Sequence, residues 1–157
     1  PGQLVGYPIV DLNRFGRDLH CYLRRLEQLL TATLAEFGIS STTRTGATGV
    51  WVGKKKIASI GIAVRRWIAW HGFALNVSND LSLFASIIPC GLRDVAMTSM
   101  EQELGYGVDM KCVEDALVEQ YCRTFGSPCL GERTFETVSG GFPELEMKGE
   151  ANRCAQA

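Results

Sequence analysis

Three side chains in the middle of the chain have the chemistry of a nucleophilic site: a lysine, a histidine and a cysteine. Cys90 stands in Pro-Cys-Gly, a turn sequence in which backbone amides can point at a bound carbonyl and glycine permits close approach. A thiol becomes a nucleophile when a neighbouring base or cation favours the thiolate, and the candidates for that neighbour are Lys56 and His71. The alternative is that Cys90 is an inert core thiol, because free cysteine is among the most buried residue types.

Lys56 is the last of three consecutive lysines and opens an apolar segment. If a strand starts there, the Lys56 side chain shares a face with every second residue that follows, because side chains alternate along a strand. Those residues are Ala58, Ile60, Ile62 and Val64. Burial among them disfavours the ammonium form and lets Lys56 act as a base. The alternative is that the three lysines form the solvated tip of a hairpin.

His71 precedes Gly72 in a strand-like segment and could pair with Cys90 as in cysteine hydrolases. It could equally be a structural histidine of a sheet. The other cysteines are expected to be core or tail thiols of a cytoplasmic protein, because no pair has the C-x2-C spacing of a zinc site and no secretory signal is present. They are Cys21, Cys112, Cys122, Cys129 and Cys154.

The composition is that of an ordinary globular domain. The chain has 157 residues, 46% of them apolar and 21% charged, with a net charge of -1. The sequence has no excess of basic residues, so we expect neither nucleic acid nor anionic lipid as a partner. Arg65, Arg66 and His71 interrupt the most apolar stretch, so we expect no membrane span. The phosphate-binding, dinucleotide-binding and serine-esterase motifs are absent from the sequence as well.

Hydrophobic periodicity places these residues on a sheet flanked by helices. Apolar residues at spacings of three and four predict a helix over 17–37, ended by Gly38, and another over 110–125 that starts at Asp109. Strand patterns predict strands over 4–12, 49–53, 56–64 and 67–77, the last three as an antiparallel meander, with a polar loop over 40–46 and a helical turn at 83–86. The order strand, helix, meander, helix indicates an α+β fold.

Four motifs in register resemble the octanoyltransferases of lipoate synthesis (octanoyl-acyl carrier protein:protein N-octanoyltransferases). They are "PGQLVGYPI" at 1–9, "GVWVGKKKIASIG" at 49–61, "HGFALNVSNDLSLF" at 71–84 and "PCG" at 89–91. The resemblance covers the chain from Pro1 to about Phe125. It implies the fold of lipoate and biotin protein ligases, an antiparallel or mixed sheet with flanking helices.

The resemblance also implies roles for particular residues. Cys90 would be the acyl-accepting nucleophile, and Lys56 would lower the pKa of that thiol or take its proton as general base. The acyl chain and its thioester would lie against two short segments of the predicted meander. These substrate-binding residues are Ser59, Ile60, Gly61, Gly72, Phe73 and Ala74.

The implied reaction moves an octanoyl group from octanoyl-acyl carrier protein, through a Cys90 thioester, to a lysine of a lipoyl domain. The acceptors would be the lipoyl domains of 2-oxoacid dehydrogenases and the H protein of glycine cleavage. Because a thioester is already activated, the resemblance implies no ATP, no other cofactor and no metal. The alternatives are a lipoate or biotin ligase-like protein of the same fold that uses ATP, and a non-catalytic fragment of the family.

The family carries an arginine- and glycine-rich stretch with a Thr-Tyr-His run upstream of the motif at which this chain begins. We therefore expect residues 1–126 to form an octanoyltransferase catalytic domain that is N-terminally incomplete. Residues 127–157 have no repeated apolar face, so we expect a disordered tail there.

Overall fold

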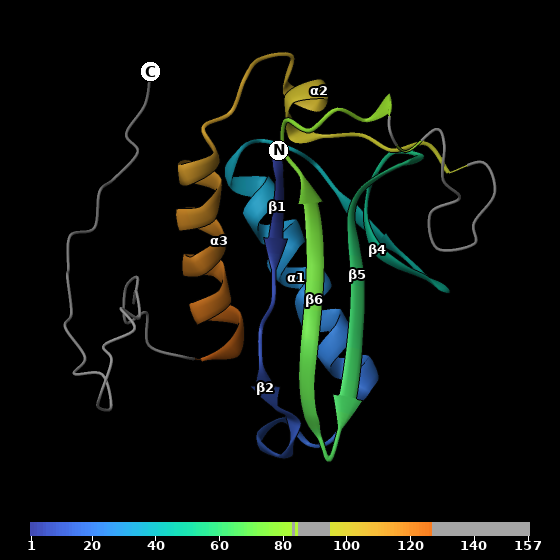
Figure 1. Cartoon of the computed structure of the whole chain (residues 1–157), viewed down its shortest axis with the longest axis vertical. Helices are drawn as coiled ribbons and strands as arrows, with labels where there is room; N and C mark the ends of the chain where they lie inside the picture. The colour runs from blue at the N-terminus through green and yellow to red at the C-terminus, as the bar shows by residue number, and fades with distance from the viewer. Residues whose placement is uncertain (83, 85–94, 127–157) are drawn as a thin grey trace, which may run out of the picture.

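A computed structural model describes residues 1–82, 84 and 95–126 of the chain. The elements in chain order are β1 (Gln3–Gly6), β2 (Val10–Asp11), the 3-10 helix η1 (Leu12–Phe15), α1 (Leu19–Glu36), β3 (Thr42–Arg44), β4 (Ala47–Val52), β5 (Lys55–Arg65), β6 (Ile68–Asn76), α2 (Met100–Leu104) and α3 (Met110–Phe125). Helix α1 packs across one face of the sheet and α3 packs against α1 (Figure 1).

The sheet is antiparallel, with strand order β1-β6-β5-β4-β3 and β2 paired to β6 beyond the end of β1. Strands β4, β5 and β6 are the predicted meander, and an isolated parallel bridge joins Lys56 to Met97. The predicted α+β fold, a sheet with flanking helices, is therefore confirmed.

The two long helices follow the periodicity of the sequence. In α1 the residues that face the sheet are buried, among them Leu26, Leu30 and Leu34. Asp18 caps this helix by accepting from the amide of Cys21 at 2.9 Å. In α3, Asp109 is the N-cap and Gly126 ends the helix in the left-handed region at φ 63°. Amphipathic spacing and capping residues together therefore predicted both helices to within a few residues.

Three elements differ from the predictions. The strand expected over 4–12 is divided into β1 and β2, because Pro8 has no amide hydrogen for the sheet, and Leu12 already begins η1. The polar loop expected over 40–46 contains the edge strand β3. Helix α2 was not predicted, because its five residues are too few to show a helical period.

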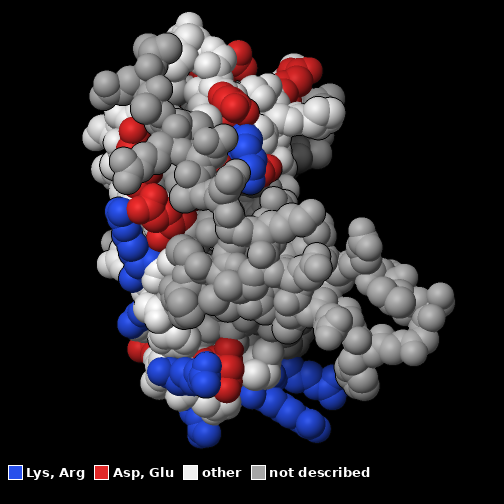
Figure 2. All heavy atoms as spheres, turned by 90° about the vertical axis from the view of Figure 1, so that its left-hand side faces the viewer, with Lys and Arg blue, Asp and Glu red and all other residues white. Residues whose placement is uncertain are grey.

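Several predictions fall on residues outside the described part of the chain: the helical turn at 83–86, except Phe84, the tail over 127–157 and Cys90 itself. Within the described part, none of the helices has the length and hydropathy that crossing a bilayer requires. Described side chains of both charge signs lie on the face in Figure 2, acidic ones mostly toward its upper end and basic ones toward its lower end. This face therefore carries no field of a single sign.

Candidate functional site

Lys56 is a buried lysine. Lys56 is 2% exposed, whereas Lys54 and Lys55 are both exposed. Lys55 forms an ion pair with Glu103 at 3.4 Å. Only the first part of the lysine run is therefore the solvated hairpin tip, and the expectation that Lys56 is drawn out of solvent is confirmed.

The face of the sheet to which Lys56 belongs is not the predicted one. Along β4 and β5, Val50 pairs with Ala58 but Trp51 pairs with Lys56, so β5 has one extra residue at this point. Such a bulge reverses the alternation of side chains. Ala58 faces α1 with the hydrophobic core, and Lys56 and Trp51 lie on the opposite face. The expectation that Lys56 shares a face with Ala58, Ile60, Ile62 and Val64 was wrong for this reason.

The Lys56 side chain lies across β4. Its Nζ atom is 5.5 Å from the centroid of the Trp51 ring, and a Cβ atom at Gly49 would fall 2.5 Å from its Cε atom. Trp51 is 1% exposed, and the guanidinium group of Arg44 also lies over its ring, 4.2 Å from the centroid. Among the described residues, no hydrogen-bond acceptor or carboxylate partners Lys56 Nζ.

The chain returns to Lys56 directly after the segment that contains Cys90. The amide of Lys56 donates to the carbonyl of Ala96 at 2.8 Å, and the amide of Thr98 donates to the carbonyl of Lys56 at 3.0 Å. Cys90 itself lies outside the described residues, six positions before Ala96 in the sequence.

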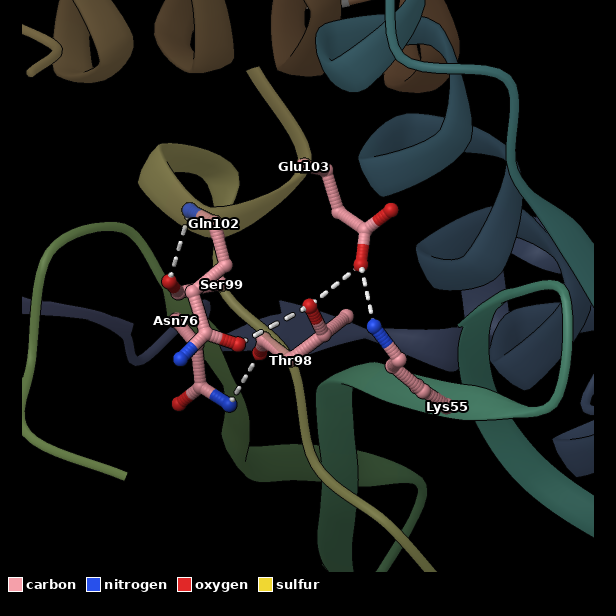
Figure 3. A network of polar contacts seen from close by, with 6 residues as sticks. All are labelled: Lys55, Asn76, Thr98, Ser99, Gln102 and Glu103. Carbon is pink, nitrogen blue, oxygen red and sulfur yellow. Dashed lines mark hydrogen bonds and ion pairs between the residues drawn. The ribbon is translucent and has the colours of Figure 1, made fainter. Parts of the chain in front are cut away.

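A network of polar contacts fixes this returning chain to the sheet (Figure 3). The buried side chain of Asn76, at the end of β6, donates to the carbonyl of Thr98 at 2.9 Å and accepts from Gln3 Nε2 of β1 at 2.8 Å. Thr98 Oγ1 donates to Glu103 Oε1, the atom that also pairs with Lys55. Strands β1, β5 and β6 are thus linked to residues 96–103 at the end of the sheet where Lys56 lies.

The six expected substrate-binding residues form three cross-strand pairs on β5 and β6: Ser59 with Ala74, Ile60 with Phe73, and Gly61 with Gly72. Ile60 and Phe73 belong to the hydrophobic core on the helix face, at 9% and 5% exposure. The other two pairs alternate to the opposite face, which is the face of Lys56. Four of the six residues thus share a face with Lys56.

Gly61 and Gly72 have different surroundings. A Cβ atom at Gly61 would meet no atom within 4 Å, whereas one at Gly72 would fall 2.2 Å from the carbonyl oxygen of Gly6 and 2.6 Å from Cδ of Pro8. The connection between β1 and β2 therefore crosses directly over Gly72. Of this pair, only Gly61 has free space beside it.

His71 pairs with Ile62, well along β5 from the end where Lys56 lies. It is exposed and has a backbone φ of 63°, a left-handed conformation that is uncommon in non-glycine residues. The structure therefore does not bring His71 and Lys56 together. Two other expectations concern cysteines. Cys21 is a free thiol but is exposed on α1 rather than in the core, and Cys112 and Cys122 of α3 are each disulfide-bonded, which corrects the expectation of core or tail thiols at these positions.

Sequence reasoning missed two residues that shape the surroundings of Lys56. Trp51 is the ring beneath its ammonium group, and Glu27 of α1 accepts a hydrogen bond from the amide of Gly49. The signals were a glycine inside a strand pattern, which often marks a bulge, and a glutamate within the apolar stripe of a helix. In the described residues, no group of three or more His, Cys, Asp or Glu side chains could hold a metal ion.

Comparison with known proteins gives one family and one fold. Residues 1–122 match the model of the lipoyl protein ligase A/B catalytic domain. The chain is 50% identical over 121 residues to an octanoyltransferase of Geobacter metallireducens, which covers 77% of this chain and 57% of that protein. It is 49% identical over 129 residues to an octanoyltransferase of Gloeobacter violaceus, covering 82% of this chain and 57% of that protein. The chain thus spans little more than half the length of these relatives.

Solved structures of ligases share the fold. The apo structure of a biotin protein ligase from Aquifex aeolicus has a TM-score of 0.63 at 19% identity, over 80% of this chain and 53% of that chain. A lipoate-protein ligase A bound with ATP has a TM-score of 0.61 at 16% identity, over 76% of this chain and 50% of that chain. At this level of identity the likeness concerns the fold alone, and it confirms the expected lipoate and biotin protein ligase architecture.

Proposed function

Because the chain belongs to the lipoyl protein ligase A/B catalytic domain family, we propose that it provides the nucleophile and the base of an octanoyltransferase. The proposed enzyme moves an octanoyl group from octanoyl-acyl carrier protein to a lysine side chain of a lipoyl domain. The acceptors are the lipoyl domains of 2-oxoacid dehydrogenases and the H protein of glycine cleavage. Curated relatives that are about half identical to the chain and are named octanoyltransferases support the reaction class.

The observation that carries the proposal is the state of Lys56. A lysine side chain is very rarely this buried unless it is paired, and no described residue supplies a hydrogen-bonding or charged partner for Lys56. The Lys56 nitrogen, which no described residue holds by a hydrogen bond or an ion pair, is therefore the group to which we assign the exchange of a proton with the thiol. Cys90 lies six positions before Ala96, whose carbonyl accepts from the amide of Lys56, and we take its thiol as the nucleophile.

In the first step, Lys56 accepts the proton of the Cys90 thiol, and the thiolate attacks the carbonyl carbon of the donor thioester. The bond between that carbon and the donor sulfur breaks, and the donor leaves as a free thiol after taking the proton from Lys56. The product is an octanoyl thioester on Cys90. No oxidant, metal or nucleotide takes part, because the donor thioester supplies the activation.

In the second step, the amine of the acceptor lysine attacks the octanoyl carbonyl carbon on Cys90. An amide bond forms, the bond to Cys90 Sγ breaks, and Lys56 removes the extra proton from the attacking nitrogen and returns it to the sulfur. In this scheme the open part of the Lys56 face, with Ser59, Gly61 and Ala74, holds the acyl chain. The core pair Ile60 and Phe73 shapes this surface from behind, and Gly72 lets the β1–β2 connection close its edge.

Intact-mass measurement tests the proposal. The chain is incubated with octanoyl-acyl carrier protein, and the modified residue is located by peptide mapping. We expect a single octanoyl adduct on Cys90 that disappears when a lipoyl domain is added, and no adduct with Cys90→Ser. If octanoylation of the lipoyl domain requires ATP and free octanoate and survives Cys90→Ser, the protein is a ligase. If no cysteine is acylated, the chain is a non-catalytic member of the family.

A further inference from the structure

Glu27 is a buried carboxylate that the proposed reaction does not use. It lies in the middle of α1, on the side of the helix that packs against the sheet, and is 1% exposed. Its Oε2 atom forms an ion pair with Arg24, one turn earlier on the helix. Its Oε1 atom accepts a hydrogen bond at 3.1 Å from the backbone amide of Gly49 in β4. Glu27 thus connects the helix layer to the strand over which Lys56 lies.

Gly49 has a backbone conformation that only glycine adopts readily. Its φ is 132°, and a Cβ atom there would fall 2.5 Å from Lys56 Cε, 3.2 Å from Lys56 Nζ and 2.6 Å from the carbonyl oxygen of Ala58. The Lys56 side chain therefore occupies the space that a side chain at position 49 would take. The position of the lysine depends on how the backbone of β4 is turned at this residue.

We propose that Glu27 is a positioning residue for Lys56, acting through Gly49. By accepting from the Gly49 amide, its carboxylate holds Gly49 in the backbone conformation that leaves space for the Lys56 side chain above Trp51. The catalytic meaning of this role rests on the proposed function, but the positional role does not. The side chain suits the task because its length brings one oxygen to the Gly49 amide while the other faces Arg24.

Two conservative variants separate the length of the side chain at position 27 from its charge. Glu27→Gln keeps an oxygen at the position of Oε1 but loses the charge. Glu27→Asp keeps the charge but is one methylene shorter, so that its oxygen no longer reaches the Gly49 amide. If Glu27 positions Lys56 through this hydrogen bond, Glu27→Gln behaves like the wild type and Glu27→Asp does not. If the charge alone matters, the order is reversed.

The test is competitive labelling of lysine amines with trace acetic anhydride, followed by peptide mass spectrometry. In the wild type we expect Lys56 to react roughly tenfold or more slowly than exposed Lys54, because the amine of a buried residue reacts only after local opening. Glu27→Gln is expected to retain this ratio, and Glu27→Asp to bring the two rates within about threefold of each other. Circular dichroism establishes that every variant is folded at the labelling temperature.

Thr33→Ala is the matched control. Thr33 is also fully buried on α1, and its hydroxyl donates to the carbonyl of Leu29 within the helix rather than to the sheet. We expect this variant to lose stability while the Lys56 to Lys54 labelling ratio stays at the wild-type value. The proposal is overturned if Glu27→Asp retains the wild-type ratio, if Glu27→Gln loses it, or if Lys56 is unprotected in the wild type. Because neither an octanoyl donor nor an acceptor domain is used, the result is independent of whether the chain transfers octanoyl groups.

Discussion

Lys56 and Trp51 are direct cross-strand partners, and the ammonium group of the lysine lies 5.5 Å from the centroid of the indole ring. A cation over an aromatic ring gains about 0.5–2 kcal/mol. Removing an ammonium group from water costs several kcal/mol even after the surrounding structure relaxes. The ring therefore offsets only part of the cost that a buried charge at Lys56 carries, which favours a role for this lysine other than stability.

Replacement of Lys56 by methionine should separate stability from function. We expect Lys56→Met to keep or raise the free energy of unfolding, by up to about 2 kcal/mol, because a side chain of similar volume is buried without a polar group. The same variant should slow octanoyl transfer by about 10²- to 10⁴-fold through loss of the base. Urea unfolding and a transfer assay give the two values. Lys54→Met, at an exposed position, is the control and should change neither by much.

The glycine pair of β5 and β6 supplies a second prediction. Gly72→Ala should cost about 3 kcal/mol or more, because the new Cβ would overlap backbone and proline atoms of the β1–β2 connection. Gly61→Ala, directly across the ladder, should leave stability unchanged or raise it by up to about 1 kcal/mol. Thermal and urea unfolding of the two variants provide the comparison. Equal losses at both positions would contradict the close crossing over Gly72.

A bulkier residue at Gly61 tests the proposed acyl surface. Gly61→Leu should fold, because no atom lies within 4 Å of its Cβ position, yet it should slow acylation of Cys90 by octanoyl-acyl carrier protein. We expect a loss of about tenfold or more if the acyl chain lies on the Lys56 face, since blocking a binding surface removes apolar contact area. Wild-type acylation rates in a folded Gly61→Leu protein would place the acyl chain elsewhere.

Asn76 is the cross-link that holds the chain returning to Lys56. Asn76→Ala should destabilise the protein by about 2–4 kcal/mol, because it leaves the Thr98 carbonyl and the Gln3 amide group without their partner. Gln3→Ala removes only one of the two bonds and should cost about 1 kcal/mol. Urea unfolding measures both. If the two variants lose the same stability, Asn76 does not link β1 to residues 96–98 in the way described.

The pH dependence of stability should report on Tyr22. Its ring is 1% exposed between α1 and α3, and burial raises its pKa from the ordinary value to about 12. Because the unfolded state releases this proton near pH 10, the contribution of Tyr22 is complete below that pH and is lost as pH rises toward about 12. Tyr22→Phe should therefore be at least as stable as the wild type at pH 8, and its advantage should grow near pH 11.

At neutral pH the same variant tests a buried hydroxyl. In the described part of the chain Tyr22 Oη has no hydrogen-bond partner, so its removal should cost nothing and can add up to about 1 kcal/mol. Burial also raises the pKa of Tyr121, and this residue is still present in the variant. We therefore expect Tyr22→Phe to lose some stability at alkaline pH as well. A loss of more than about 1 kcal/mol at pH 8 would contradict an unpartnered hydroxyl.

The helices and the meander could be predicted because their signals are local. The 3.6-residue period of α1 and α3, the terminal residues Gly38 and Asp109, and the alternation in β5 and β6 each depend on residues a few positions apart. The burial of Lys56 was predicted for the wrong reason, because the apolar residues expected beside it, from Ala58 onward, lie on the opposite face of the sheet.

The surroundings of Lys56 could not be predicted because they depend on contacts between distant segments. The extra residue of β5 opposite Val50 changes the face to which Lys56 belongs, and periodicity within β5 alone does not reveal it. The crossing of Pro8 over Gly72 joins residues that are 64 positions apart. Glu27 reaches Gly49 across the interface between helix and sheet. Each of these relationships is set by tertiary packing, which a single sequence does not encode locally.

The account depends most on Lys56 as the group that activates Cys90. The most direct test is the rate at which octanoyl-acyl carrier protein acylates Cys90, followed by intact mass near pH 7 in the wild type and in Lys56→Met. We predict an adduct on Cys90 in the wild type that forms at least ~100-fold more slowly in the variant. Equal rates in the two proteins, or an adduct on another cysteine, would contradict the account.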